Sequence, residues 1–124
     1  MMNEECTIFI IDDDMSLCRA LARLLKSTGY QDVRTYASAE DFITEASPNP
    51  CAIMILDLQL PGMSGIELIE NLRSAGSSMP IILISAHDEQ LARAREMRHE
   101  WAAFLHKPFE ERELISVIDS LCAA

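Results

Sequence analysis

The sequence predicts an α/β protein with a doubly wound, five-stranded parallel sheet, and three observations point to this fold class. Short apolar runs alternate with amphipathic helical segments five times along the 124 residues. The runs at 51–56 and 80–85 are almost entirely apolar, as expected of strands covered by helices on both faces. The connections are short, and right-handed crossovers then make the strands parallel. We expect one domain over residues 1–124.

Each expected element has a local basis. The strands are short runs rich in apolar and β-branched residues, expected at residues 6–11, 32–36, 51–56, 80–85 and 102–106. The run at 32–36 alternates between polar and apolar residues, so this strand should expose one face to water. The helices repeat apolar residues every three or four positions, expected at about residues 15–28, 38–46, 66–72, 88–99 and 110–121.

Capping residues place several helix ends. Asp14 precedes the first helix and is interpreted as its N-cap rather than as a metal ligand, and Gly29 ends that helix. Ser38 is the expected N-cap of the second helix, which stops before the Pro-Asn-Pro segment at 48–50.

Composition excludes several classes of protein. The formal charge of −10 argues against binding to nucleic acid or to an anionic membrane by this domain. No apolar run approaches the roughly 20 residues of a membrane span, and the first residues lack the basic start of a signal peptide, so we expect a cytoplasmic location. Four scattered cysteines without metal-ligand spacing are expected to be buried small hydrophobes: Cys6, Cys18, Cys51 and Cys122.

Reactive side chains fall at the same end of several strands. Asp12 and Asp13 follow the first strand, Asp57 the third, Ser85 ends the fourth, and Lys107 follows the fifth. Ligands bind beyond the carboxyl ends of strands in such sheets. Carboxylates about 4 Å apart repel by a few kcal/mol per pair at an effective dielectric near 20, and a divalent cation removes that penalty. Oxygen-only ligands predict Mg²⁺, with Mn²⁺ as an acceptable substitute.

Four motifs in order make the chain resemble a response-regulator receiver domain of two-component signalling over its whole length. These are "IDDD", "ILDLQLPGMSG", "ISA" and "FLHKPF", with spacings of 45, 28 and 22 residues from Asp12 through Asp57 and Ser85 to Lys107. The resemblance is to CheY-like receivers, and in particular to the FixJ type. It implies a flavodoxin-like sheet with the strand order 2-1-3-4-5.

The resemblance also implies roles for the site residues. Asp57 corresponds to the phosphoacceptor, which takes a phosphoryl group from a histidine kinase or a phosphotransfer protein. Asp13, Asp57 and the backbone carbonyl of Gln59 would coordinate Mg²⁺ directly, with Asp12 acting largely through water. Lys107 would supply a positive charge and the Ser85 hydroxyl would hold a phosphoryl oxygen, because phosphoryl transfer depends on charge neutralisation and positioning. The chain would otherwise not be an enzyme.

Further roles implied by the resemblance concern the conformational switch on phosphorylation and the lifetime of the phosphoryl group on Asp57. The resemblance implies a cis bond between Lys107 and Pro108, and an aromatic switch at Phe104 that turns inward when Ser85 moves. Gln59 and His87 flank the pocket and are expected to tune the rate of dephosphorylation.

The output surface is expected on the fourth helix, fifth strand and fifth helix. Arginines concentrate there, at Arg93, Arg95 and Arg98, and could bind a protein partner or a second copy of the chain, although such a charge run is commonly only a solvated helix face. Trp101 stands where receivers often have a small residue, and is expected to fill a groove near this surface or to pack against the last helix.

Other readings remain open. A stand-alone single-domain regulator is favoured, and the alternative is a receiver from a FixJ-like DNA-binding transcription regulator. A more remote alternative is a haloacid-dehalogenase-like phosphatase, which would need a D-x-D motif, but the segment from Asp57 to Gln59 lacks the second acid.

Overall fold

The computed structural model describes residues 6–46, 51–86 and 88–123 and contains five strands and five helices in strict alternation. The strands are β1 (Thr7–Ile11), β2 (Asp32–Tyr36), β3 (Ala52–Asp57), β4 (Ile81–Ser85) and β5 (Ala103–His106). The helices are α1 (Met15–Ser27), α2 (Ala39–Glu45), α3 (Gly65–Ser74), α4 (Asp88–Glu96) and α5 (Glu111–Ala123). No helix in these ranges is long and apolar enough to cross a membrane.

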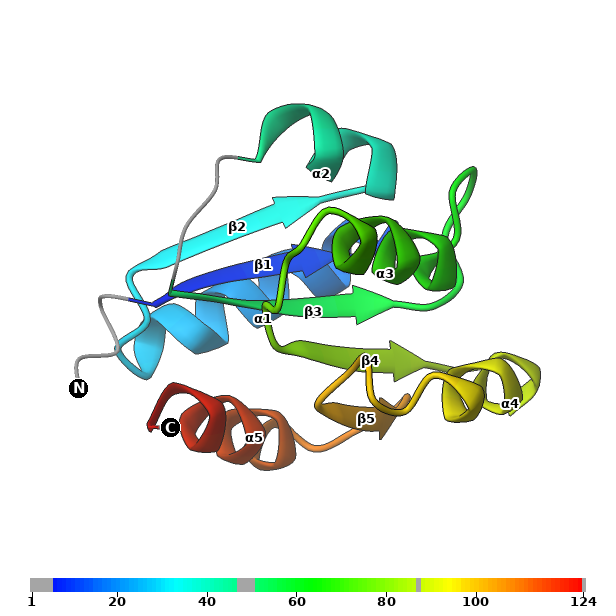
Figure 1. The fold of residues 1–124 in the computed structure, drawn as a ribbon. Helices are drawn as coiled ribbons and strands as arrows, with labels where there is room; N and C mark the ends of the chain where they lie inside the picture. The colour runs from blue at the N-terminus through cyan, green and yellow to red at the C-terminus, as the bar shows by residue number, and fades with distance from the viewer. Residues whose placement is uncertain (1–5, 47–50, 87, 124) are drawn as a thin grey trace.

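All strand pairs are parallel, and the sheet order is β2-β1-β3-β4-β5, which confirms the expected topology (Figure 1). The direction in which successive strands are added to the sheet reverses at β1, because β2 pairs on one side of it and β3 on the other. The carboxyl ends of β1 and β3 therefore lie side by side, and this is where such sheets bind ligands.

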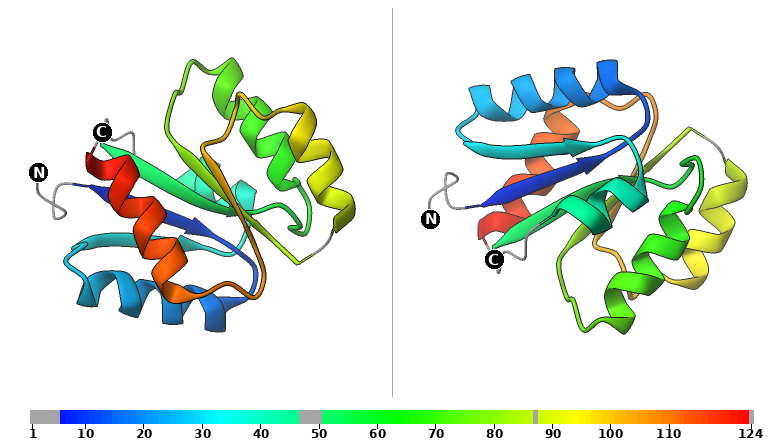
Figure 2. Two further views of the ribbon diagram at one scale, coloured as in Figure 1. Left: turned by 90° about the horizontal axis from the view of Figure 1, so that it is seen from below. Right: turned by 90° about the horizontal axis from the view of Figure 1, so that it is seen from above.

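Two apolar clusters, one on each face of the sheet, form the core. Helices α1 and α5 cover one face, and α2, α3 and α4 cover the other (Figures 1 and 2). The central strands β1, β3 and β4 are buried along their whole length, as expected for strands covered on both sides. Their alternate residues contribute to opposite clusters, since side chains alternate across a strand.

The predicted caps are confirmed. The Asp14 side chain accepts hydrogen bonds from the backbone N–H groups of Ser16 and Leu17, at 3.1 and 3.2 Å, and so begins α1. The Ser38 hydroxyl accepts from the Asp41 N–H at 3.0 Å and begins α2. Both capping residues supply acceptors to N–H groups that have no partner within the helix.

The fourth helix is shorter than its periodicity predicts. It ends at Glu96, whereas the sequence indicated helix to residue 99. Tight turns replace the last helical turn, with the Met97 N–H bonded to the Ala94 carbonyl at 3.0 Å and the Glu100 N–H to the Met97 carbonyl at 2.8 Å. The tighter turns bring the chain back toward β5.

The prediction that all four cysteines are buried is wrong. Cys6 and Cys18 are buried, but Cys51 is exposed and Cys122 is only half-buried. Three of the four also lie together, which their spacing in the sequence does not reveal, because they are brought together by β1, the start of β3 and the end of α5.

Candidate functional site

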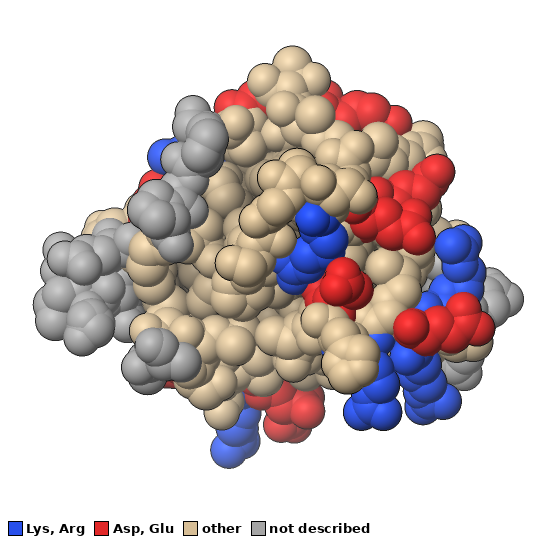
Figure 3. Space-filling view, viewed as in Figure 1, with Lys and Arg blue, Asp and Glu red and all other residues tan. Residues whose placement is uncertain are grey.

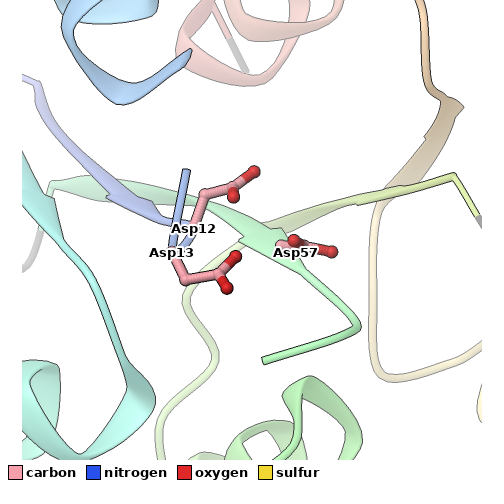
Figure 4. A group of neighbouring side chains, drawn as sticks. All are labelled: Asp12, Asp13 and Asp57. Atoms are coloured by element: carbon pink, nitrogen blue, oxygen red, sulfur yellow. The ribbon is translucent and has the colours of Figure 1, made fainter. Parts of the chain in front are cut away.

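The carboxylates of Asp12, Asp13 and Asp57 meet at the carboxyl edge of the sheet. β1 and β3 are in register, with Ile11 opposite Leu56, so the next residue of each strand reaches the same level. Each of the three acids offers a carboxylate oxygen within 4.8 Å of the others. The three side chains project from the strand ends in the same direction (Figure 4).

Asp12 is a completely buried carboxylate with a partner for each oxygen. Its Oδ1 accepts a hydrogen bond from the Asp14 backbone N–H at 2.9 Å, and its Oδ2 accepts from the Lys107 ammonium at 2.8 Å. A buried charge is tolerated when it is paired and hydrogen-bonded, and Asp12 meets both conditions.

Asp57 is 6% exposed and forms the last residue of β3. The Gln59 backbone N–H donates to its Oδ1 at 3.0 Å, and the Lys107 ammonium lies 3.4 Å from its Oδ2. Burial raises the pKa of Asp57 to about 6, with Asp12 adding repulsion, while the Gln59 N–H and Lys107 oppose the rise. The carboxylate is thus oriented by the backbone and incompletely compensated in charge.

Lys107 reaches the site from the segment after β5. Its backbone N–H donates to the Ser85 carbonyl at 2.8 Å, and its peptide bond to Pro108 is cis, as the resemblance implies. Burial opposes the charged form of the ammonium, but the hydrogen bond to Asp12 and the charge of Asp57 prevail and raise the pKa of Lys107. The lysine therefore remains protonated between the two carboxylates.

An open cleft of about 280 Å³ lies over these groups. It is lined by Asp12, Asp13, Asp14, Asp57, Gln59, Ala86 and Lys107. Ser85 is completely buried and does not belong to this lining, so its hydroxyl would have to move to reach a group in the cleft. His87 lies outside the described residues.

The donor set fits magnesium. Three carboxylates supply oxygen ligands, two of them buried and the third, Asp13, exposed at the opening. No histidine or cysteine belongs to the group, and hard oxygen ligands with access to water suit Mg²⁺ rather than zinc.

Two residues outside the predicted set of site residues shape the loop after β3, Gly65 and Glu40. Gly65 opens α3 so close to β3 that a Cβ atom there would lie 2.7 Å from the Asp57 carbonyl oxygen and 2.8 Å from the Leu58 Cα. Glu40 on α2 accepts a hydrogen bond from the Met63 N–H at 2.8 Å, which holds the loop against α2. The glycines of the "LPGMSG" segment indicate a turn, but the close approach of Gly65 to the backbone of Asp57 and Leu58 depends on how α3 packs against β3.

The expected switch and output residues lie away from the cleft. Phe104 is half-buried and packs against the core cluster beneath α2, α3 and α4. Trp101 joins the same cluster and donates its indole N–H to the Ala94 carbonyl at 2.8 Å, so it packs against α4 and not against the last helix.

The arginines expected on the output surface are exposed. Arg93 and Arg95 lie on α4, and Arg98 lies in the turn after it. Basic side chains gather beside acidic ones at the lower right of Figure 3, over the region where Figure 1 labels α4.

Comparison with known proteins identifies the family. Residues 8–119 match the model of the response regulator receiver domain. The response regulator TmoT of Ectopseudomonas mendocina is 33% identical over 118 residues, which are 95% of this chain and 53% of that protein. The chain belongs to the response regulator receiver domain family.

Solved structures agree with this assignment. The response regulator StyR is 39% identical, with a TM-score of 0.84 over 93% of this chain and 58% of that one. The FixJ-N structure is 31% identical, with a TM-score of 0.82 over 94% of this chain and 93% of that one. The chain spans about half the length of the curated relatives it matches.

Proposed function

We propose that this receiver accepts a phosphoryl group on Asp57 from a histidine kinase or a phosphotransfer protein, in a reaction that depends on Mg²⁺. The arrangement of Asp12, Asp57 and Lys107 carries the proposal: two buried carboxylates share one ammonium group, at 2.8 and 3.4 Å, at the bottom of an open cleft. One of these carboxylates, Asp57, is held by the Gln59 N–H with its other oxygen toward Lys107.

Asp57, Lys107 and Ser85 would have different roles in the phosphoryl transfer. An oxygen of Asp57 attacks the phosphorus as the bond between phosphorus and the histidine nitrogen of the donor breaks. Lys107 offsets negative charge on the transferred group, and a Ser85 hydroxyl that turned toward the cleft would hold one of its oxygens. Because phosphoryl transfer needs positioning and charge neutralisation above all, these groups suffice without a general base.

Asp13, Asp57 and the Gln59 carbonyl would hold the metal, with Asp12 behind them through water. The bound ion would supply positive charge to the phosphoryl oxygens and cancel the repulsion among the carboxylates. Burial raises the pKa of Asp57 to about 6, which disfavours the ionised carboxylate. A bound cation would lower this pKa and so favour the ionised form, which is the nucleophile.

Intact-mass spectrometry tests the proposal directly. Incubation with a small acyl phosphate and Mg²⁺ should add one phosphate to the wild-type chain, and none to Asp57→Asn. A phosphate on any other residue, or an adduct that forms equally without a divalent cation, contradicts the assignment. Turnover of a small phosphomonoester would instead revive the phosphatase alternative.

The phosphorylated state is proposed to act through the surface of α4, β5 and α5. Exposure of Arg93, Arg95 and Arg98 beside acidic residues supports a charged contact with a protein partner or a second copy of the chain. An Arg95→Glu variant should still accept phosphate while losing that association, as measured by light scattering and partner capture. Unchanged association in this variant would reject the output surface.

Two readings of the whole protein remain distinct. A stand-alone regulator would work by protein contact alone, whereas a longer regulator would pass the switch to a DNA-binding domain. The half-length coverage of TmoT and StyR supports the second reading. Reading the gene downstream of codon 124 to its stop codon distinguishes the two.

A further inference from the structure

Three cysteines meet at the edge of the sheet opposite to the cleft. Cys6 precedes β1, Cys51 precedes β3, and Cys122 lies in the last turn of α5. The pairing of Thr7 with Ala52, and the hydrogen bond from the Thr7 N–H to the Cys51 carbonyl at 2.9 Å, place Cys6 beside Cys51. The end of α5 lies next to the start of β1 in both views of Figure 2, which brings in Cys122.

The sulfur atom of Cys6 contacts the sulfur atoms of both Cys51 and Cys122. The Cys6 Sγ lies 2.7 Å from the Cys122 Sγ and 3.2 Å from the Cys51 Sγ. A disulfide has a sulfur–sulfur distance of about 2.05 Å, so bonding requires approaches of only about 0.7 and 1.2 Å. Either pair can form a bond, but both cannot at once, because Cys6 belongs to each.

Exposure distinguishes the three thiols. Cys51 is exposed, Cys122 is half-buried, and Cys6 is 5% exposed. A small reagent in solution therefore reaches Cys51 first, and a thiol attacks a disulfide only where it has access. Cys122 is positioned by its surroundings, since it neighbours the Tyr30 hydroxyl, which is itself hydrogen-bonded to Asp119.

We propose that Cys6, Cys51 and Cys122 form a thiol–disulfide exchange site that reacts with low-molecular-weight disulfides and ends as a Cys6–Cys122 disulfide between β1 and α5. Cys51 serves as the point of entry and Cys6 as the relay. In a reducing compartment a bond of this kind forms transiently and senses redox conditions.

The exchange balances in three steps. The Cys51 thiolate attacks the small disulfide, forms a mixed disulfide and releases one small thiolate. The Cys6 thiolate then attacks the Cys51 sulfur, forms the Cys6–Cys51 bond and releases the second small thiolate. Finally the Cys122 thiolate attacks the Cys6 sulfur and frees the Cys51 thiolate. Two protein thiols are oxidised and one small disulfide is reduced, and the two protons lost by the protein thiols are taken up, through solvent, by the two released small thiolates.

The cross-link would join the first strand to the last helix and leave the cleft intact. Cys51 directly precedes the six-residue strand β3 and Asp57 is its last residue, so the two are separated by about 20 Å of extended chain. Phosphate acceptance and disulfide formation should therefore be separable. Failure of one does not imply failure of the other.

The experiment treats the native full chain with oxidised glutathione, alkylates the remaining thiols, and maps the peptides without reduction. Digestion at acidic residues separates Cys6 from Cys18, because Asp12, Asp13 and Asp14 lie between them. The wild type should lose two of its four alkylatable thiols, retain no glutathione, and yield a peptide pair containing Cys6 and Cys122. The melting temperature should rise on oxidation and return with dithiothreitol.

Three variants test the relay. Cys51→Ser should slow the bond by about tenfold or more, since the entry thiol is lost. Cys122→Ser should stop at the Cys6–Cys51 bond. Cys18→Ser is the matched control and should behave as the wild type, because Cys18 is completely buried and burial raises its pKa to about 11.

Several results would overturn the proposal. The first is a wild-type chain that keeps four alkylatable thiols, and the second is a disulfide that includes Cys18. The third is a Cys51→Ser variant that oxidises at the wild-type rate. The fourth is a disulfide that forms only under denaturing conditions. The wild-type map alone decides the first, second and fourth, so the test does not depend on the folding of a variant.

Discussion

A single ammonium group offsets two buried carboxylates at the carboxyl edge of the sheet. Lys107 contacts both Asp12 and Asp57, and Asp13 adds a third negative charge at the opening of the cleft. The side-chain charges of these four residues therefore sum to about −2 when all are ionised, which a divalent cation would cancel. Buried charge imbalance of this kind is common at functional sites.

Asparagine at position 57 is expected to stabilise the metal-free protein at neutral pH. Burial and then the charge of Asp12 raise the pKa of Asp57 from 3.8 to about 6. The stability contributed by this carboxyl group is therefore fully present below pH 3.8 and is lost as the pH rises through about 6. Asp57→Asn should remove that loss and raise the free energy of unfolding by about 1–3 kcal/mol at pH 7.5 in a chelator.

Urea unfolding at about pH 4 and pH 7.5 measures this effect. The gain from Asp57→Asn over the wild type should be clear at the higher pH and small at the lower one. Glu70→Gln, an exposed neutralisation on α3, is the control and should change stability by less than about 0.5 kcal/mol. An equal gain at both pH values would contradict the raised pKa.

The Gln59 side chain is expected to control how long a phosphoryl group persists on Asp57. It is exposed and lines the cleft, while its backbone N–H holds the Asp57 carboxylate. Gln59→Ala retains the backbone contact but opens the cleft to water, so the lifetime should fall by about twofold or more with little change in yield. Intact mass followed after removal of the donor measures the decay, with Gln31→Ala as the control. Equal decay in variant and wild type would reject this role.

At the scale of elements, the loop between β3 and α3 depends on several neighbouring contacts. Ser64 and Glu67 form a capping box at the start of α3, with hydrogen bonds of 3.1 and 2.9 Å. Glu40 holds the Met63 N–H from α2, and Gly65 allows α3 to begin against the Asp57 backbone. Contacts from α2 and α3 thus hold the loop beside Asp57, the proposed phosphoacceptor, and so preorganise its carboxylate.

Arg73 connects α3 to the loop before β4 and to the turn after α4 through backbone carbonyls. From the last turn of α3, its guanidinium donates to the Ser77 and Met79 carbonyls, each at 2.9 Å, and its Nε donates to the Glu100 carbonyl at 3.2 Å. Arg73→Met should keep the aliphatic packing and leave these carbonyls without the cation. We expect a loss of about 2–4 kcal/mol in the free energy of unfolding, since hydrogen bonds to charged groups are among the stronger ones.

Chemical denaturation compares this variant with Arg23→Met, a matched change on the exposed side of α1. The control should lie within about 0.5 kcal/mol of the wild type. A loss no larger in Arg73→Met than in the control would show that the carbonyl contacts contribute little.

At the scale of the whole molecule, Mg²⁺ is expected to stabilise the fold. The proposed ligand residues follow β1 or end β3, two neighbouring inner strands of the sheet, so a bound ion would favour the folded chain over the unfolded one. At ten times the dissociation constant the gain is about 1.4 kcal/mol, or a few degrees in melting temperature. Asp13→Asn should reduce this gain, whereas Asp41→Asn, an exposed change on α2, should retain it. An equal response in Asp13→Asn and the wild type would argue against the site.

The element pattern was largely predictable from the sequence, and the departures have physical causes. Strand positions were correct to within one residue, because burial on both faces leaves a continuous apolar signature. The end of α4 and the packing of Trp101 were not predictable, since they depend on tertiary contacts: Arg73 on α3 donates to the Glu100 carbonyl, and the Trp101 indole donates to the Ala94 carbonyl. The exposure of Cys51 was also not predicted, since it depends on where the chain enters β3 at the surface and not on its neighbours in the sequence.

The sequence by itself determined the alternation of strands and helices, the caps at Asp14 and Ser38, and the set of acids and lysine at the strand ends. These features are local, since periodicity, capping and motif spacing depend on neighbouring residues. Only the tertiary structure decided that Lys107 bridges Asp12 and Asp57, that Ser85 is buried outside the lining of the cleft, and that three distant cysteines meet. Such contacts join residues up to 116 positions apart, so they depend on how the sheet orders its strands and how the last helix packs against it.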